Sequence, residues 1–416
     1  MKNIIAHSFA GLKTLEISEL IILGLFVALI PWNWHLLSPL MTLFAVNTVA
    51  KMIVSRKMGN DALSRWSRMG LWLMVALYLL HAVSLLYTAD IQSGLSMMGR
   101  RLPFLIFPLC FLAADSSSLR QPQRRILCGL FVVSLVVKFF FCLVKVVVTT
   151  HAARFWVNFD ATHHTYMAMY LLFAIGFLYS EWYAFRGSMS KCHIWLLACT
   201  AIILMAYTVF VMSRTGIAGL IVMVLAVVVH LFFFAKERKK ALLLLLLAGV
   251  VGTGVYAVLP ENYRRITKTF KGETDPSGDI RWSIMDASLK AIGKSLPFGV
   301  GIGDKDDVLE QVYSEYGNEH MMKAQYNSHN MYLDITLTMG VLGILLLLSV
   351  IVVPLSVAVR TRDIALMAFL FAFAFSGLFE AILNRMMGTP FVALFVTLLL
   401  VTCSVPKCPS QEIADR

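Results

Sequence analysis

Charged residues are scarce in this sequence, and their scarcity restricts the possible fold classes most strongly. Asp, Glu, Lys and Arg together make up 14% of the 416 residues, whereas apolar residues make up 59%. Mean hydropathy is +0.76, a value that no soluble globular domain of this length would have. The composition therefore excludes a soluble enzyme and predicts a polytopic membrane protein.

The sequence also lacks the features of several other protein classes. Its seven cysteines lie in or beside apolar segments and form no Cys-x-x-Cys pair, so neither a disulfide framework nor a zinc site is indicated. Internal repeats and low-complexity tracts are absent. The net charge of +12 comes from basic residues spread among short loops instead of a stripe, so we expect no nucleic-acid binding.

Long apolar segments fill most of the chain. A membrane span needs roughly 20 apolar residues. Lys2 and Lys13 precede the first segment, but no soluble mature region follows, so we expect this segment to remain as a span. By this measure the sequence predicts an all-α polytopic membrane protein with about twelve transmembrane helices, at 17–34, 36–54, 69–88, 102–114, 126–149, 163–182, 193–212, 216–235, 241–259, 329–356, 364–380 and 388–404.

One long connection, residues 260–328, divides these spans into two groups. The predicted organisation is nine spans in residues 1–259, a loop domain at 260–328, and three spans with a tail in 329–416. Long loops in compact proteins usually carry function. We therefore expect the loop domain to contribute to the functional site.

Basic residues are unevenly divided between the two sides of the predicted spans. With the N-terminus in the cytoplasm, the cytoplasmic loops include Arg56, Lys57, Arg120, Arg124, Arg125, the KERKK run at 236–240, Arg360 and Arg362. The short outer loops hold Arg100, Arg101, Arg154, Arg214 and Arg385. This asymmetry follows the positive-inside rule. It predicts cytoplasmic termini and a 260–328 loop on the outer side.

The 260–328 loop carries two amphipathic helix patterns. Asp279 can cap a helix that runs to about Ala291, and Asp304 or Asp306 can cap a second one. The apolar residues that share one face are Ile280, Ile284, Ala287 and Ala291 in the first helix, and Val308, Leu309, Val312 and Tyr316 in the second. The glycine-rich segment between them has no βαβ unit around it, so we expect a turn and not a dinucleotide site.

A polar pair, His329–Asn330, stands at the start of the long apolar segment that follows this loop. A histidine with an ordinary pKa near ~6.5 can change protonation at neutral pH. Polar side chains that enter a membrane helix face protein or water and not lipid. Gly340 and Gly343 follow, one helical turn apart, where small residues let another helix approach closely. The pair indicates a reaction centre, and a helix-capping pair is the alternative interpretation.

Two arginines are candidates for binding an anionic group near this pair. Arg214 lies at the outer junction of the seventh and eighth predicted spans, where a guanidinium is costly to desolvate without an anionic partner. It can bind a phosphate bidentately, or it can extend to the interface as a snorkelling arginine. Arg281 belongs to the first turn of the first loop helix and can point toward His329.

Further polar residues lie at the same predicted face. His163 and His164 are adjacent, without the i, i+4 spacing of a helical two-histidine metal site, so we expect them to contact substrate or the loop. Glu380 can face the site, or it can pair internally with Arg385. The weaker candidates, which can equally be solvated surface charges, are Arg264 and Arg265 in a basic stretch after the ninth span, and Arg100 and Arg101 in a short outer loop.

These residues resemble the signature of the bacterial O-antigen ligases. The resemblance rests on His329–Asn330, followed after nine residues by Gly340 and after two more by Gly343. The segment SRTG at 213–216 is similar to the first essential-arginine site of that family. Arg281, before the 297–303 turn, is similar to the second. The resemblance covers about 160–395, and the broader superfamily also includes O-antigen polymerases and membrane protein O-oligosaccharyltransferases.

The resemblance implies a GT-C-like glycosyltransferase at the periplasmic face of the bacterial inner membrane. Such an enzyme transfers a preassembled glycan from undecaprenyl pyrophosphate to a sugar hydroxyl of the lipid A core, with inversion and without ATP, metal or another cofactor. Departing pyrophosphate needs cationic stabilisation, and the acceptor hydroxyl needs a base. Arg214 and Arg281 would serve the first need, and His329 would serve as the base or as a positioning group.

The remaining site residues are expected to bind the substrates. These are Asn330, Arg264, Arg265, His163, His164, Arg100, Arg101, Glu380 and Arg385. The expected partners are the lipid-linked donor, the lipid A core acceptor and membrane lipids. A transporter or flippase is the rival, because Lys138 lies deep in the fifth predicted span and needs a polar interior. The concentration of polar residues at one face favours glycan transfer over transport.

Overall fold

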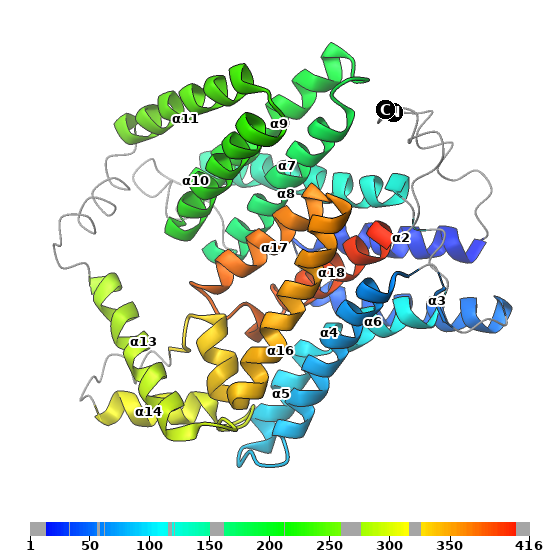
Figure 1. Ribbon diagram of the computed structural model, residues 1–416. Coiled ribbons are helices and arrows are strands. Elements are labelled where there is room, and N and C mark those ends of the chain that lie inside the picture. Colours follow the sequence, from blue (N-terminus) through cyan, green and yellow to red (C-terminus); the bar gives the residue numbers. More distant parts are fainter. Residues whose placement is uncertain are drawn as a thin grey trace.

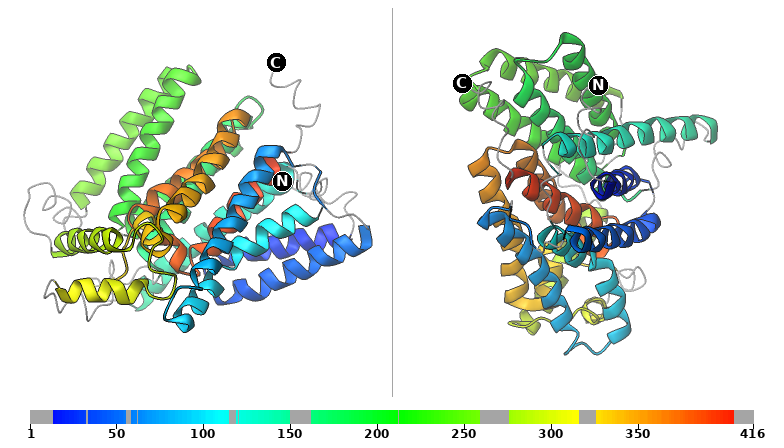
Figure 2. Two further views of the ribbon diagram at one scale, coloured as in Figure 1. Left: turned by 60° about the horizontal axis from the view of Figure 1, so that its bottom comes forward. Right: turned by 90° about the vertical axis from the view of Figure 1, so that its right-hand side faces the viewer.

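The computed structural model describes residues 14–32, 34–55, 59–61, 63–114, 119, 121–149, 162–211, 213–258, 276–315 and 326–404. Within these ranges the regular structure is helical and includes no β-strand. The all-α prediction is therefore confirmed. Figure 1 shows the helices, and Figure 2 shows α9, α10 and α11 grouped on one side of the molecule, with α2 and α3 on another.

Every predicted span overlaps a helix. In chain order the helices are α2 (Thr14–Leu29), α3 (Leu37–Ser55), α4 (Arg65–Ser84), α5 (Ile91–Arg101), α6 (Pro103–Ala113), α7 (Gln121–Thr149), α8 (His164–Phe185), α9 (Lys191–Phe210), α10 (Arg214–Val229), α11 (Arg238–Val258), α16 (Met331–Thr361), α17 (Ile364–Gly377) and α18 (Thr389–Ser404). The π-helical turn η3 (His230–Phe234) extends α10, and the short η1 (Trp34–Leu36) and η4 (Ile382–Asn384) precede α3 and α18.

Among the described helices, fewer than twelve meet the requirements for crossing a membrane. Seven are long and apolar enough, or eight if the pair α5 and α6, bent by 42°, forms one span. The helices α17 and α18 are apolar but shorter. The chain is thus a membrane protein with seven or eight span-length helices in the described ranges, and twelve spans stay a prediction.

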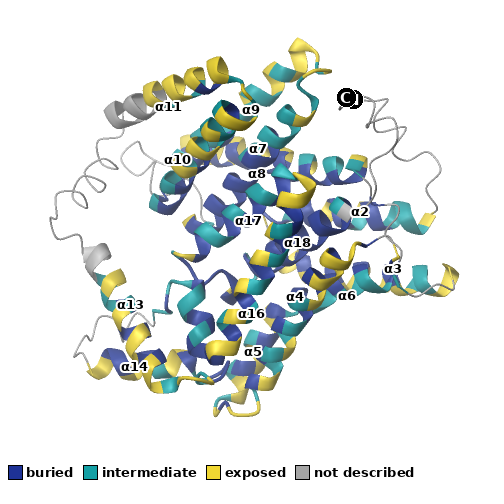
Figure 3. Ribbon diagram, viewed as in Figure 1, coloured by how far each residue is buried: buried dark blue, intermediate teal, exposed yellow. Residues whose placement is uncertain are grey.

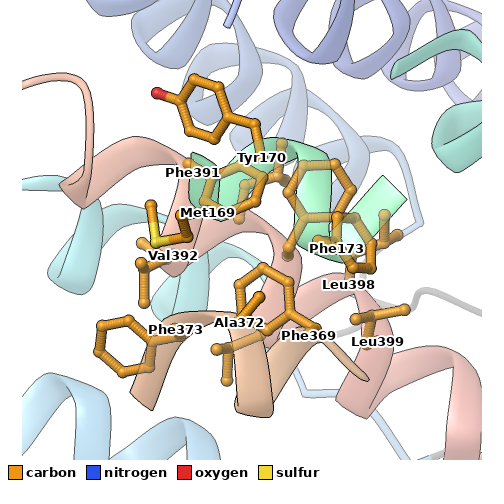
Figure 4. Close-up of a cluster of buried hydrophobic side chains, with 14 of the residues drawn as sticks. Met169, Tyr170, Phe173, Phe369, Ala372, Phe373, Phe391, Val392, Leu398 and Leu399 are labelled. Carbon is orange, nitrogen blue, oxygen red and sulfur yellow. The ribbon is translucent and has the colours of Figure 1, made fainter. Parts of the chain in front are cut away.

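Three helices, α8, α17 and α18, form the centre of the structure. Their side chains are apolar on all faces: α8 is buried from Thr165 to Ala174, and α18 is buried from Phe391 to Val401. A helix that is apolar all round is stable only when other helices surround it. Figure 4 shows Phe173 of α8, Phe369 of α17 and Phe391 of α18 packed together, and the Phe173 and Phe369 ring centroids are 5.1 Å apart. This core positions the start of α8 and the end of α17, and the candidate site lies there.

The peripheral helices α9, α10 and α11 carry many exposed residues, coloured yellow in Figure 3, and large apolar side chains are among them. Examples are Trp195, Leu225 and Leu246, all of which are exposed. In water such a surface would drive association, but it suits a bilayer, where apolar side chains face lipid.

The loop between α11 and α16 contains α13 (Pro276–Ser295) and α14 (Lys305–Glu315), which overlap both predicted amphipathic helices. Their apolar faces form a second core with Leu337 of α16, made of Ile284, Ala287, Ala291, Ile292, Leu309, Val312 and Tyr313. Tyr316 of the predicted second face lies outside the described residues. Figure 1 shows α13 and α14 beside the beginning of α16. The loop therefore packs on the membrane helices through the apolar faces that the periodicity of its sequence predicted.

Ion pairs at the surface also join the two loop helices. Lys290 and Lys294 of α13 contact the carboxylate of Glu315 in α14 at 2.8 and 2.9 Å. The hydrogen bonds that Lys290 and Lys294 donate lower the pKa of the exposed Glu315 carboxyl to about 2. These pairs orient α14 against α13, but exposed pairs of this kind stabilise a protein only slightly.

The turn between α13 and α14 docks into a break in α16. Gly340 has φ 62° and ψ −148°, so α16 consists of two helical pieces that meet at this residue. Backbone groups of the turn bond to the groups that the break leaves unpaired: Val300 N–H donates to Leu337 C=O at 2.8 Å, and Val341 N–H donates to Pro297 C=O at 2.9 Å. A Cβ atom on Gly340 would lie 1.8 Å from the Pro297 oxygen. Only glycine fits this position.

This arrangement corrects the prediction that Gly340 and Gly343 share one face of a continuous helix. The predicted spacing assumed an unbroken helix, whereas Gly340 leaves the helical conformation. A Cβ atom on Gly343 would lie 2.6 Å from the Cβ of Met339, on the other side of the break. The two glycines therefore allow the break and the docking of the loop turn, rather than the approach of another helix.

Asp304 also has a role that differs from the expected helix cap. Its carboxylate accepts hydrogen bonds from the backbone N–H groups of Ala89 and Asp90, at 2.8–3.0 Å. Nearby, Gly303 N–H donates to the hydroxyl of Thr88 at 2.9 Å. These bonds attach the loop domain to the connection between α4 and α5.

Candidate functional site

The site is centred on a hydrogen bond between His329 and Glu380. His329 precedes α16, and its imidazole Nδ1 lies 3.1 Å from Glu380 Oε2. Glu380 follows α17 in the segment 378–388, and its side chain is 2% exposed, whereas that of His329 is 24% exposed. The carboxylate is therefore inside the protein, and the imidazole is accessible from outside.

The backbone around His329 holds the imidazole in place. His329 has a positive φ of 42°, which is uncommon for a non-glycine residue. Its N–H donates to the side-chain oxygen of Asn327 at 2.9 Å. The tight turn aims the side chain back toward the 378–388 segment instead of along α16.

His163 contacts the same carboxylate from the other side. Its Nε2 lies 3.5 Å from Glu380 Oε2, and its side chain is 30% exposed. The other ring nitrogen, Nδ1, is buried and has no hydrogen-bond partner among the described residues. His163 immediately precedes α8, so the packing of α8 against α17 brings the two histidines to one carboxylate.

Glu380 also accepts a hydrogen bond from the Ala381 N–H, at 3.2 Å. Its two oxygens thus have three N–H groups within reach, counting one from each imidazole. Hydrogen bonds to the charged form favour ionisation. A buried carboxylate with this surrounding stays ionised at neutral pH, and it orients whichever imidazole N–H faces it.

Asn330 caps α16. Its side-chain oxygen accepts from the N–H groups of Tyr332 and Leu333, at 2.9 and 3.1 Å, and its Nδ2 donates to Leu378 C=O at 3.1 Å. The prediction of a helix-capping pair is therefore correct for Asn330 but not for the side chain of His329. Asn330 therefore caps the start of α16, and the side chain of His329 faces Glu380.

A buried polar network lies behind this pair, and sequence reasoning missed its centre. Asp334, in the first turn of α16, accepts from Lys305 Nζ at 2.7 Å and from Asn384 Nδ2 at 2.8 Å. Arg101 donates to Asn384 Oδ1 at 2.8 Å, and it lies 3.7 Å from Asp334. Lys305, Asp334 and Arg101 are all at most 3% exposed. The network ties α5, α14, α16 and the 378–388 segment together behind the site.

The structure brings Arg214 to the same end of the molecule. Arg214 is the first residue of α10, where Ser213 caps the helix by accepting from Gly216 N–H at 3.1 Å. A Cβ atom on Gly216 would lie 2.9 Å from the Cβ of Ala168, four residues after His164. The start of α10 therefore packs beside the start of α8, at the level of the two histidines.

Arg281 lies on α13 and is exposed. Its neighbour Ile280 packs against the core that α13 and α14 form with Leu333 and Leu337 of α16. The helix that carries Arg281 thus covers the first turns of α16, which begin directly after His329 and Asn330.

The other predicted residues divide into three groups. His164 and Arg385 are exposed at this end of the molecule. Arg100 is exposed and donates to Asn384 C=O at 3.4 Å, whereas Arg101 is buried in the network. Arg264 and Arg265 lie outside the described residues. The alternative pairing of Glu380 with Arg385 is replaced by the contacts of Glu380 with the two histidines.

Lys138 of α7 reaches toward this end as well. Its buried ammonium donates to the Pro31 C=O and to the hydroxyl of Thr162, the residue directly before His163. The polar surroundings that the sequence required for Lys138 are therefore protein oxygens next to the site.

The residues at this end can perform two kinds of chemistry. A neutral imidazole whose Nδ1–H is held by a carboxylate presents an unprotonated Nε2, which can accept a proton from a hydroxyl. Guanidinium groups can bind phosphate oxygens and stabilise negative charge. In the described part of the chain, no three His, Cys, Asp or Glu side chains are grouped to hold a metal ion.

Comparison with known proteins identifies one family. The family model described as O-antigen ligase matches residues 199–348. The matched range includes Arg214, Arg281 and His329, but it excludes His163 and Glu380. None of the curated proteins matches the chain.

Proposed function

We propose that this member of the O-antigen ligase family transfers a preassembled glycan from undecaprenyl pyrophosphate to the lipid A core oligosaccharide. In this proposal the reaction takes place at the periplasmic face of the inner membrane, the side to which we assign the His329 end of the molecule. The observation that carries the proposal is the accessible imidazole of His329, held at 3.1 Å by the buried Glu380 carboxylate.

The proposed reaction is an in-line displacement. The acceptor sugar hydroxyl attacks the anomeric carbon of the donor and gives its proton to Nε2 of His329. The bond from that carbon to the pyrophosphate oxygen breaks on the opposite side, and the oxygen keeps the electron pair. Attack opposite the leaving group inverts the anomeric configuration. The protein supplies a base and charge stabilisation.

Arg214 and Arg281 would stabilise the leaving pyrophosphate. Their helices reach the site from two sides, because the start of α10 packs beside α8 and α13 covers the start of α16. A planar guanidinium matches two phosphate oxygens at once, and it keeps its charge at any physiological pH. Arg385 is exposed beside Glu380 and would add positive potential where the donor enters.

The placement of charged side chains supports glycan transfer over transport. A transporter holds its substrate with polar groups near the bilayer midplane. Lys138, the residue that suggested a transporter, bonds to Thr162 at the same end as the two histidines. Lys138 lies in the interior of α7, but its ammonium is directed to the end where the other polar groups of the site lie.

Deletion of the gene in its own bacterium tests the proposal. We expect electrophoresis of the surface lipopolysaccharide to show bare lipid A core, with lipid-linked polymer accumulating in the inner membrane. Wild-type protein and a His193→Ala control should restore the polymer ladder, because His193 is exposed at the start of α9. His329→Ala should not restore it.

Two other activities of the superfamily give different results in the same experiment. Loss of an O-antigen polymerase would leave core that bears one repeat unit. Loss of a protein O-oligosaccharyltransferase would leave the lipopolysaccharide unchanged and remove glycans from protein. Either pattern would replace the ligase proposal by the corresponding activity.

A further inference from the structure

Glu380 lies between two imidazoles whose surroundings differ. Nδ1 of His329 and Nε2 of His163 reach the same oxygen, Oε2, at 3.1 and 3.5 Å. Glu380 and His163 lie outside residues 199–348, the range that the family model matches. Their roles therefore have to be derived from their contacts.

The buried Nδ1 of His163 limits the protonation of this side chain. In a protonated imidazole both ring nitrogens are donors. A protonated His163 would therefore place an N–H group at Nδ1, which is buried without a partner. Leaving a donor of a charged group unsatisfied in the interior is costly. His163 is thus held neutral, with its hydrogen on Nε2 facing the carboxylate.

His329 differs from His163 because its side chain is accessible and both of its ring nitrogens can form hydrogen bonds. Nδ1 donates to Glu380, and Nε2 remains to exchange a proton with a ligand or with water. An ionised carboxylate beside an imidazole favours its protonated form. The carboxylate therefore fixes the orientation and tautomer of His329 and stabilises the imidazolium that proton transfer creates.

We infer that Glu380 is the positioning residue of the base His329, and that His163 is a neutral, fixed donor that keeps Glu380 ionised and in place. The effect of this arrangement on the reaction rests on the proposed glycan transfer, whereas the arrangement itself does not. Within the described part of the chain, the groups that face Glu380 are His329, His163, Arg385, the Ala381 N–H, and Tyr166, whose hydroxyl bonds to Ala381 C=O at 3.3 Å.

The arrangement can be measured without any glycan substrate. Nitrogen-15 NMR of the full-length protein labelled at histidine reports which ring nitrogen carries the hydrogen. In the wild type we expect the hydrogen on Nδ1 of His329 and on Nε2 of His163, because these atoms face Glu380. In Glu380→Gln the preference of His329 for the Nδ1–H form should weaken, because a neutral amide is a poorer acceptor than a carboxylate.

The same spectra test the protonation state of His163, because a protonated imidazole carries hydrogen on both ring nitrogens. We expect His163 to carry hydrogen on Nε2 alone at neutral pH. Hydrogen on both nitrogens would overturn the assignment of His163 as a neutral donor. His163→Gln places an amide donor near Glu380 and should leave His329 in the same Nδ1–H form as in the wild type.

Glycan transfer provides the second measurement. Glu380→Gln should lower kcat by about 10²-fold, the lower range for a general base, with little change in KM. Glu380→Asp keeps the carboxylate and should retain the Nδ1–H form of His329 and part of kcat, which guards against misfolding of the Gln variant. Glu310→Gln, on the exposed face of α14, is the matched control and should change neither quantity.

The outcomes distinguish this inference from the proposed function. Unchanged kcat and an unchanged Nδ1–H preference of His329 in Glu380→Gln would overturn the positioning role. If the preference changes as expected but the wild-type protein transfers no glycan, the ligase proposal fails and the assignment of Glu380 and His163 stands.

Discussion

The ammonium of Lys305 donates a 2.7 Å hydrogen bond to the carboxylate of Asp334, and both side chains are almost completely buried. Lys305 begins α14 in the loop domain, whereas Asp334 lies in the first turn of α16, five residues after His329. Asn384 bonds to the same carboxylate oxygen at 2.8 Å. One buried carboxylate therefore joins the loop domain and the Glu380 segment to the helix that carries the proposed base.

Loss of the Lys305 ammonium should destabilise the protein strongly. Removing one partner of a buried ion pair costs about 3–5 kcal/mol, because the other charge is left without compensation. We expect Lys305→Met to lower the apparent Tm of the detergent-purified protein. Adding Asp334→Asn should not recover the loss, because Asp334 is also the counter-charge of the buried Arg101, 3.7 Å away.

The matched control for Lys305→Met is Lys294→Met in α13. Lys294 also pairs with a carboxylate, that of Glu315, but both side chains are exposed. Exposed pairs contribute little, so the Tm of this variant should stay close to that of the wild type. Equal shifts in the two variants would show that the buried pair is no stronger than the surface pair.

Gly340→Ala should disrupt the docking of the loop domain on α16. The added Cβ would lie 1.8 Å from the Pro297 oxygen, and the backbone conformation at Gly340 is one that only glycine adopts readily. Strain of this kind costs about 1–3 kcal/mol before the clash is counted. Limited proteolysis of the 260–328 loop should become faster than in the wild type.

Gly293→Ala is the control for this substitution. Gly293 lies in α13, with open space where a Cβ would stand, and alanine favours a helix by about 1 kcal/mol relative to glycine. We expect unchanged or slower proteolysis. Resistance of Gly340→Ala equal to that of Gly293→Ala would contradict the docking of the turn into the break of α16.

The helices were predictable because their signals are local. Apolar runs and 3.6-residue periodicity are properties of neighbouring residues, so the overlap of every predicted span with a helix, and the faces of α13 and α14, follow from the sequence. His329 and Asn330 were recognisable from a short motif for the same reason. The helix cap at Asn330 also needs only the next three residues.

The remaining features depend on partners that are distant in the sequence. The break at Gly340 exists because the 297–301 turn supplies hydrogen bonds to it, and no pattern within α16 indicates this. No local pattern distinguishes Lys305 from the charged residues beside it, because its partner Asp334 is 29 residues away. Glu380 was noticed as polar, but its contact with His329 spans 51 residues and results from the packing of α16 and α17.

The orientation of the chain in the membrane can be tested with reporter fusions. The unequal distribution of Lys and Arg predicts that reporters in the KERKK segment at 236–240 and at Arg416 report the cytoplasm, and that one at Lys271 reports the periplasm. A cytoplasmic signal at Lys271 would place the 260–328 loop on the wrong side for a periplasmic reaction. The proposed function would then be excluded.

The last prediction separates the roles of the arginines from that of His329. Arg214→Lys and Arg281→Lys keep the charge, but a compact ammonium cannot bind two phosphate oxygens in the fork geometry of a guanidinium. We expect both variants to lose most transfer activity and to bind the undecaprenyl pyrophosphate-linked donor more weakly. His329→Ala should lose activity by about 10²–10⁴-fold while donor binding is retained, because the imidazole acts on the acceptor hydroxyl.

Donor binding and transfer to core acceptor should be measured on each purified variant, with thermal unfolding as the check on folding. Arg238→Lys, at the start of α11, is the control, since its guanidinium lies 5.3 Å from the ring centroid of Phe232, away from the site. Both of its activities should match the wild type. Suppose instead that His329→Ala binds donor much more weakly than Arg214→Lys and still turns over at saturating donor. His329 would then contact the donor, and the base would have to be another residue.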